Sequence, residues 1–231
     1  MRLKICGLFR DEDIDYVNEA RPDYAGFVFA ESKRRVTPVL AQYLRFRLVN
    51  SIIPVGIFVD ARIAEITTLY QNGIISIAQL HGDEDDSYIN ALKKASGSKP
   101  IPIIKSIKIN TLTTNQNELV PAVRTRTSIR NQSSSSSSSC GSWLKSLSTT
   151  ADYLLIDSGA GSGKTFNWDI LDSVKFPKPW FLAGGINTKN IEKAMAIKPF
   201  AVDISSGAET DGFKDREKIL FFSSAVKGKL K

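Results

Sequence analysis

The sequence predicts an α/β protein folded as a closed (β/α)8 barrel in a single domain, and two observations support this. Eight short apolar or β-branched segments recur along the chain with amphipathic segments between them, a pattern typical of βα units around a parallel sheet. Seven of the eight are nearly continuous apolar runs, as expected for strands covered on both faces. The predicted strands are 2–6, 24–29, 54–59, 75–80, 101–107, 153–157, 180–184 and 200–205.

The segments between the strands predict helices, several of which begin with Asp, Asn or Thr as capping residues. The clearest helical segments are 11–20, 61–72, 85–95 and 187–197. An open, doubly wound sheet is the rival architecture, but it usually carries one dominant glycine-rich turn after its first strand. Here the glycines follow the sixth, seventh and eighth strands. Barrels commonly build a phosphate site after strands seven and eight, so this placement favours the barrel.

Residues 110–150 interrupt the alternation of strands and helices. This segment contains seven consecutive serines, 133–139, and has little apolar surface to offset the entropy of ordering it. It predicts a flexible, low-complexity insertion around helix five, within one barrel that spans 1–231. A regulatory or interaction segment is the alternative interpretation.

The composition indicates an ordinary cytoplasmic enzyme. The formal charge is +7, but the segment from Lys99 to Thr150 holds seven basic residues and one acidic residue, so the remainder is nearly neutral. Because the remainder is nearly neutral, no nucleic-acid partner is expected. No membrane partner is expected either, because no window approaches the roughly 18 consecutive apolar residues of a membrane span. The first strand begins at residue 2, which leaves no room for a signal peptide. Cys6 and Cys140 lie far apart and predict neither a disulfide framework nor a metal site.

Barrel enzymes place their chemistry at the carboxyl ends of the strands, and this gives a short set of candidates. Cys6 closes the first strand beside a glycine, where an exposed thiol is suited to act as general base; the alternative is a small buried hydrophobic residue. Asp157 closes the apolar run of the sixth strand. A carboxyl with apolar neighbours can hold a proton and act as general acid, although a helix cap or loop-ordering role is equally open.

Glycine-rich turns indicate a phosphate site. Gly184-Gly185 and Ser205-Ser206-Gly207 follow adjacent strands, where backbone N–H groups can converge on one anion. The segment GAGSGKTF (159–166) fails as a nucleotide-binding P-loop, because Ser158 stands where that motif needs its first glycine. Gly161, Gly163 and Lys164 remain candidates for a loop that cradles a phosphate or covers a substrate.

Two further residues complete the predicted pocket. Arg34 follows the second strand, and its guanidinium can donate two parallel hydrogen bonds to a carboxylate. His81, which follows the fourth strand, is the single histidine of the chain. This count excludes a multi-histidine metal site and leaves His81 as a pocket or loop-ordering residue.

Taken together, these segments resemble the phosphoribosylanthranilate isomerases, a TIM-barrel family of tryptophan biosynthesis. The resemblance covers nearly the whole chain outside 110–150. The motifs that carry it are KICG (4–7), GFVFAESKR (26–34), VGIFV (55–59), QLHGDE (79–84), LLID (154–157), GSGKTFNW (161–168), LAGGIN (182–187) and VDISSGAE (202–209).

The resemblance implies an aldose–ketose isomerase that carries out an Amadori rearrangement of N-(5-phosphoribosyl)anthranilate by proton transfer, without cofactor or metal. It implies that Cys6 is the general base and Asp157 the general acid, that Arg34 holds the anthranilate carboxylate, and that Asp203 supports the polar network of the pocket. The partner would be a small phosphorylated substrate, bound by the glycine loops of a monomer or homodimer.

Two other interpretations remain open. Another phosphosugar barrel enzyme is one, but an epimerase would need several histidines with a metal, and an indole-glycerol-phosphate synthase would need a lysine and glutamate set. The other is a non-catalytic barrel that binds a phosphorylated ligand, or one whose basic insertion contacts nucleic acid. Salt-dependent binding to nucleic acid, lost on deletion of 110–150, would indicate the last of these.

Overall fold

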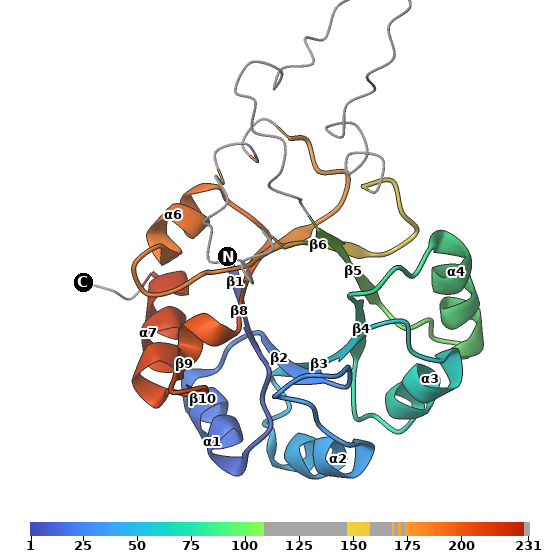
Figure 1. Ribbon diagram of the computed structural model, residues 1–231, viewed down its shortest axis with the longest axis horizontal. Helices are drawn as coiled ribbons and strands as arrows, with labels where there is room; N and C mark the ends of the chain where they lie inside the picture. The colour runs from blue at the N-terminus through green and yellow to red at the C-terminus, as the bar shows by residue number, and fades with distance from the viewer. Residues whose placement is uncertain (109–146, 158–167, 169–170, 172–173, 229–231) are drawn as a thin grey trace, which may run out of the picture.

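Eight parallel strands close into a barrel, and helices pack around its outside (Figure 1). The structure is a computed structural model that describes residues 1–108, 147–157, 168, 171 and 174–228. The predicted (β/α)8 fold is confirmed, because all eight predicted strands form and their ends differ from the prediction by at most two residues. The strands are β1 (Arg2–Cys6), β2 (Tyr24–Val28), β3 (Ile53–Phe58), β4 (Ile77–Leu80), β5 (Ile103–Lys108), β6 (Tyr153–Asp157), β7 (Trp180–Ala183) and β8 (Ala201–Ile204).

Three of the described helices, α2, α4 and α7, begin where a short polar side chain caps them. Thr37, Asp85 and Asp215 each accept a hydrogen bond from a backbone N–H in the first turn that follows. The fourth predicted helix is shorter than expected, since Asn190 accepts from the backbone N–H of Asn187 at 2.7 Å and forms a turn ahead of it. The helices are α1 (Asp11–Ala20), α2 (Pro38–Arg47), α3 (Ile63–Gln71), α4 (Asp86–Ala95), α6 (Ile191–Ala196) and α7 (Arg216–Val226).

A short excursion separates β8 from α7. It consists of a 3-10 turn, η4 (Ser206–Ala208), followed by the antiparallel pair β9 (Glu209–Thr210) and β10 (Phe213–Lys214). In barrels of this class a short extra helix after strand eight commonly borders the phosphate site. The helix that follows β8 in sequence, α7, therefore does not start at the serine-glycine turn but several residues later.

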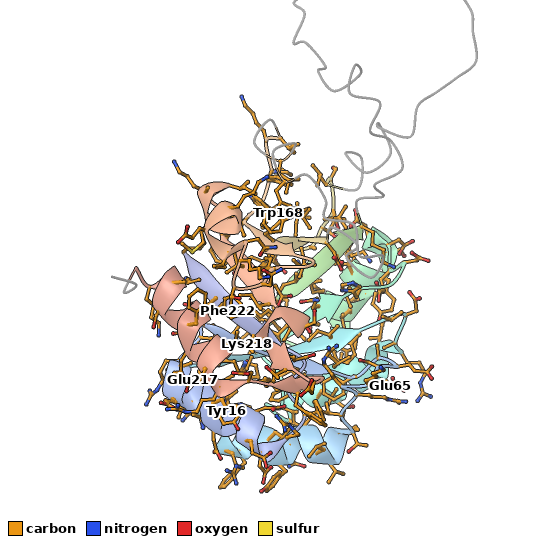
Figure 2. The ribbon with its side chains drawn as sticks, turned by 60° about the vertical axis from the view of Figure 1, so that its left-hand side comes forward. Tyr16, Glu65, Trp168, Glu217, Lys218 and Phe222 are labelled. Atoms are coloured by element: carbon orange, nitrogen blue, oxygen red, sulfur yellow. The ribbon has the colours of Figure 1, made fainter. Side chains whose placement is uncertain are left out.

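The core has two apolar layers, one between barrel and helices and one inside the barrel. Phe222 of α7 is fully buried in the outer layer, whereas Glu217 of the same helix is exposed (Figure 2). The inner layer fills the inside of the barrel with side chains from the strands, as barrel interiors require. Its buried members are Tyr24, Val55, Ile77, Ile104, Leu155, Phe181, Ala183 and Ala201.

The carboxyl-terminal end of the predicted insertion, residues 147–150, packs against the outside of the barrel and the start of α4. Leu147 is buried in the outer apolar layer, and the side chain of Thr149 and the backbone N–H of Thr150 donate to Asp86 at 2.6 and 2.7 Å. The remainder of the predicted segment 110–150 lies outside the described residues. Among the described helices, none is both long and apolar enough to cross a membrane.

Candidate active site

The two-residue repeat of the strands places polar side chains inside the barrel, above the apolar inner layer. Leu3 and Ile5 of β1 pack outward into the layer beneath the helices, so Lys4 and Cys6 of the same strand face inward. In β8 the outward residues are Val202 and Ile204, which turns Asp203 inward. Gln79 of β4 and Asp157 of β6 face inward by the same rule.

A cavity of about 410 Å³ opens at this carboxyl-terminal end of the barrel and joins most of the predicted site residues. Its wall also includes Gln79, which the sequence did not single out. Residues from β1, β4, β6, β7 and β8 therefore share one space, as the predicted mechanism requires. The predicted residues that line the cavity are Cys6, His81, Asp157, Gly184, Gly185, Asp203, Ser205, Ser206 and Gly207.

Cys6 is a buried thiol at the wall of this cavity, with 8% of its surface exposed. Gly26, its partner on β2, leaves room for it, because a Cβ at that position would lie 2.8 Å from the Cys6 sulfur. Burial raises the pKa of the Cys6 thiol, the nearby ammonium of Lys4 lowers it, and the carboxylate of Asp203 raises it again; the net direction is upward. The thiolate thus depends on nearby cations for its stability.

Lys4 and Asp203 form an ion pair inside the barrel. They are neighbours in register on β1 and β8, and the Lys4 ammonium donates to Asp203 Oδ2 at 2.7 Å and to Gln79 Oε1, also at 2.7 Å. Burial lowers the pKa of Lys4, but Asp203 and Cys6 outweigh it, so the pKa is raised and the ammonium stays charged. The sequence prediction missed Lys4 and Gln79, although inward-facing polar residues within apolar strands were a usable signal.

Asp157 and His81 meet across β6 and β4. His81 Nε2 lies 3.4 Å from Asp157 Oδ2, and His81 Nδ1 lies 3.4 Å from Gln79 Nε2. Both side chains keep about a quarter of their surface exposed, so they face the cavity rather than the core. The predicted pocket position of His81 is thereby placed beside the proposed acid.

Arg34 is not among the residues that line the cavity; its side chain packs over Gly7 and is held by a carboxylate of the protein. Its Nε and Nη2 donate to the two oxygens of Glu209 at 2.6 and 2.5 Å, and its stem covers Gly7, where a Cβ would lie 2.5 Å from Arg34 Cδ. Lys214 also donates to Glu209, at 2.5 Å. Burial raises the pKa of Glu209, but Arg34 and Lys214 outweigh it and hold it below its usual value. Glu209 and Lys214 were missed because β9 and β10 were not predicted.

The loops after β7 and β8 lie in direct contact. Gly184 and Gly185 have φ angles of 89° and 67°, which favour glycine. A Cβ on Gly207 would lie 1.9 Å from the carbonyl oxygen of Ile186, so the second loop approaches the first as closely as backbone allows. This contact brings both predicted phosphate-binding turns to one side of the cavity. The other predicted loop residues, Gly161, Gly163 and Lys164, lie outside the described residues.

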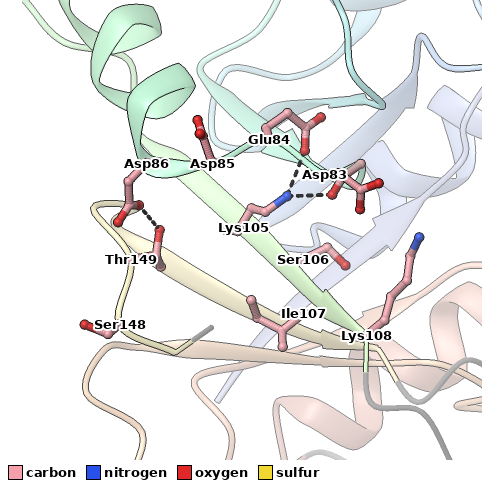
Figure 3. Close-up of a pocket in the computed structure, with 11 residues that line it drawn as sticks. Asp83, Glu84, Asp85, Asp86, Lys105, Ser106, Ile107, Lys108, Ser148 and Thr149 are labelled. Carbon is pink, nitrogen blue, oxygen red and sulfur yellow. Dashed lines mark hydrogen bonds and ion pairs between the residues drawn. The ribbon is translucent and has the colours of Figure 1, made fainter. Parts of the chain in front are cut away.

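A second cavity, about 440 Å³, lies beside the loop after β4 and contains none of the predicted site residues. Figure 3 shows its acidic wall, in which Lys105 donates to Glu84 at 2.8 Å and to the carbonyl of Gly82 at 2.7 Å. Asp86 accepts from Thr149 in the same wall. Glu84 and Asp86 therefore bind other groups of the protein. In the described part of the chain, no group of three potential ligands is arranged for a metal ion.

Comparison with known proteins identifies the family. The barrel and its cavity, with an inward thiol, an inward carboxyl and two glycine turns, place the chain among the β/α barrels that gather polar residues at the carboxyl ends of their strands. A family model for N-(5'-phosphoribosyl)anthranilate (PRA) isomerase matches residues 3–120 and 113–225. The chain is also 40% identical over 225 residues to N-(5'-phosphoribosyl)anthranilate isomerase of Endomicrobium trichonymphae, covering 95% of this chain and 94% of that one. The chain belongs to the phosphoribosylanthranilate isomerase family.

Solved structures agree with this assignment. Phosphoribosylanthranilate isomerase of Thermotoga maritima superposes with a TM-score of 0.75 at 28% identity, over 99% of both chains. A phosphoribosylanthranilate isomerase in complex with reduced 1-(o-carboxyphenylamino)-1-deoxyribulose 5-phosphate gives 0.71 at 26% identity, also over 99% of both chains. The family predicted from the sequence motifs is therefore confirmed.

Proposed function

We propose that this chain is the aldose–ketose isomerase of tryptophan biosynthesis that converts N-(5-phosphoribosyl)anthranilate into 1-(2-carboxyphenylamino)-1-deoxyribulose 5-phosphate. The observation that carries the proposal is the shared cavity, in which a thiol from β1 and a carboxyl from β6 lie together with the glycine turns after β7 and β8. A family member that binds a reduced form of this product supports the choice of substrate.

Asp157 is the proposed general acid. It donates its proton to the ring oxygen of the furanose while the bond between that oxygen and C1 breaks, and the nitrogen lone pair forms an iminium at C1. His81, 3.4 Å from Asp157, orients the carboxyl toward the ring oxygen. The step turns the ring into an open chain and makes the C2 proton acidic.

Cys6 is the proposed general base. As thiolate it takes the C2 proton, the electrons of that C–H bond form a C1–C2 double bond, and the iminium electrons return to nitrogen. The resulting enol becomes the ketone when its hydroxyl loses a proton and C1 gains one. The thiol then gives up its proton and Asp157 regains one, so the protons balance. Because every step is a proton transfer, we propose that neither cofactor nor metal takes part.

Substrate binding divides among three groups. Arg34 would hold the anthranilate carboxylate, with Glu209 fixing the direction of its guanidinium. Asp203 Oδ1 is buried and has no hydrogen-bond partner within the described residues, which leaves it to accept from a substrate hydroxyl. The turns at Gly184-Gly185 and Ser205-Gly207 would bind the phosphate, with Gly161, Gly163 and Lys164 as the predicted loop beside them.

The domain organisation and assembly are proposed with the function. We expect 1–231 to fold as one barrel domain with an insertion at 110–150, and to act as a monomer or homodimer on its small phosphorylated substrate. A family member from Thermotoga maritima is described as dimeric. Analytical ultracentrifugation of the full chain measures which of the two states it adopts.

Assay of the purified chain with phosphoribosylanthranilate in the presence of a chelator tests the proposal. We expect turnover under these conditions, and a loss of at least about a hundredfold in kcat for Cys6→Ala and for Asp157→Asn. Cys140→Ser serves as the matched control, since it removes the chain's other thiol and should retain activity.

Two results would contradict the proposal. A folded wild-type protein without turnover that still binds inorganic phosphate would indicate a phosphate-binding barrel without catalysis. Full activity of Cys6→Ala or of Asp157→Asn would remove that residue from its role while leaving the reaction in place.

A further inference from the structure

The thiol that the proposed mechanism uses as a base is in a place that opposes its ionisation. Cys6 is buried among apolar strand residues, and a thiolate in such surroundings is costly unless a cation faces it. The charged groups around Cys6 therefore decide how much thiolate the enzyme contains.

Those groups come from several elements around Cys6, and only Asp203, Asp157 and His81 among them line the cavity. Lys4 precedes Cys6 by two residues on the same inward face of β1, Asp203 comes from the adjacent β8, and Lys214 comes from β10. Arg34 approaches from the loop after β2, while Asp157 and His81 line the opposite wall. Lys214 and Arg34 are both committed to Glu209, so neither is fully available to the thiolate.

Lys4 is differently placed. Its ammonium is fully buried and is fixed by two acceptors, Asp203 Oδ2 and Gln79 Oε1, both at 2.7 Å. An ammonium has three N–H donors, so a third remains after these two bonds. Lys4 and Cys6 lie two residues apart on the inward face of β1, about 7 Å along the strand, and each favours the charged form of the other.

We propose that Lys4 is a positioning residue for the reaction, a buried cation that stabilises the thiolate of Cys6 and is itself aimed by Asp203 and Gln79. The inference deepens the proposed function and rests on Cys6 being its base. It also assigns Asp203 a second effect: the same carboxylate that holds Lys4 in place opposes ionisation of the neighbouring thiol.

The alternative is that the Lys4–Asp203 pair only fills the middle of the barrel. A purely structural pair predicts that loss of either partner destabilises the fold, since each leaves a buried charge unpaired. It predicts no particular effect on the thiol. The electrostatic role predicts that the two losses move the thiol in opposite directions, because one removes a cation and the other an anion.

The experiment is a titration of Cys6 without substrate. The ultraviolet absorbance of the thiolate is followed against pH in a Cys140→Ser background, with the Cys6→Ala protein subtracted. We expect Lys4→Met to move the midpoint up by about one pH unit or more, a tenfold loss of thiolate, and Asp203→Asn to move it down. Lys105→Met is the control, because it breaks another buried lysine–carboxylate pair away from the cavity and should leave the midpoint unchanged.

In the pH profile of kcat/KM, the midpoint of the acid limb should follow the midpoint of the thiol and shift to higher pH in Lys4→Met. An unchanged or lowered midpoint in Lys4→Met overturns the inference. If Lys4→Met does not fold, Asp203→Asn is the deciding variant. A thiol midpoint that is unchanged or raised in Asp203→Asn then overturns the inference. If the two variants show the expected shifts of the thiol midpoint but the wild-type protein has no isomerase activity, the proposed function is refuted and the pairing of Lys4 with Cys6 stands.

Discussion

Arg34 and Glu209 face each other in a two-bond ion pair, the Nε and Nη2 of the arginine against the two oxygens of the glutamate. Guanidinium and carboxylate planes match in this way, which fixes direction as well as distance. Arg34, which is expected to bind a substrate carboxylate, is thus already oriented by the carboxylate of Glu209. Lys214, also on Glu209, keeps that carboxylate in place from the other side.

Glu209→Gln should therefore weaken substrate binding more than turnover. The substitution removes the negative charge and replaces one accepting oxygen with an NH2 donor, so Arg34 loses its fixed direction, and we expect KM to rise by about tenfold with kcat changed far less. Steady-state kinetics measure both. Glu65→Gln is the control, because it breaks the exposed pair with Arg62, and exposed pairs contribute little. A fall in kcat alone would show that Glu209 acts on the chemistry instead.

Glu209 should also make the fold sensitive to acid. Its pKa in the folded protein is lowered by Arg34 and Lys214 below the ordinary value of 4.5. A carboxyl with a lowered folded pKa stabilises the fold fully above its unfolded pKa and loses that contribution as the pH falls through the folded pKa. Urea unfolding of wild type and Glu209→Gln should therefore differ most above pH 4.5 and converge below it. A difference in stability between the two proteins that stays constant as the pH falls below 4.5 would contradict a lowered pKa of Glu209 in the folded protein.

The fold was predictable because the strands of a barrel are covered on both faces. YLLID gives β6 with the expected ends, since an apolar run bounded by polar residues leaves little freedom, and RLKIC gives β1 with the expected ends although Lys4 interrupts its apolar residues. The short hairpin β9–β10 was not predicted, because two-residue strands carry no periodicity. For the same reason Lys214 was not seen as a neighbour of Arg34.

The site was predictable to the extent that strand ends converge. Cys6 and Asp157 were expected at one mouth, and both line the same cavity. The sequence could not show that Lys4 pairs with Asp203, since that contact depends on the register between the first and last strands. Nor could it show that Arg34 already has a carboxylate partner in the protein.

The close contact between the two turns that we propose bind phosphate yields another prediction. In Gly207→Ala the new Cβ would meet the carbonyl oxygen of Ile186 at 1.9 Å, so one of the two turns must move. We expect inorganic phosphate to inhibit the variant at least about fivefold more weakly, since overpacking of this kind costs about 1–3 kcal/mol.

Gly73→Ala is the control for that experiment, because it introduces backbone strain without a new contact. Gly73 also has a positive φ, 70°, but nothing lies within 4 Å of the position of its Cβ. The variant should lose about 1 kcal/mol of stability with its phosphate inhibition unchanged. Equal loss of phosphate binding in both variants would mean that general destabilisation, not the contact with Ile186, is responsible.

A substitution at Phe181 tests whether the inner apolar layer of the barrel supports the site. It is fully buried in the inner layer and packs edge-on against Tyr24 and Tyr153, with centroids 5.4 and 5.9 Å apart. Truncation to alanine leaves a cavity among strands that cannot close around it, so Phe181→Ala should lower the free energy of unfolding by about 3–5 kcal/mol. Phe46→Ala, at a side chain that is 90% exposed, should change it by less than about 0.5 kcal/mol. Urea unfolding measures both, and a small effect at Phe181 would show that the inner layer can repack without moving the strands that carry Cys6 and Asp157.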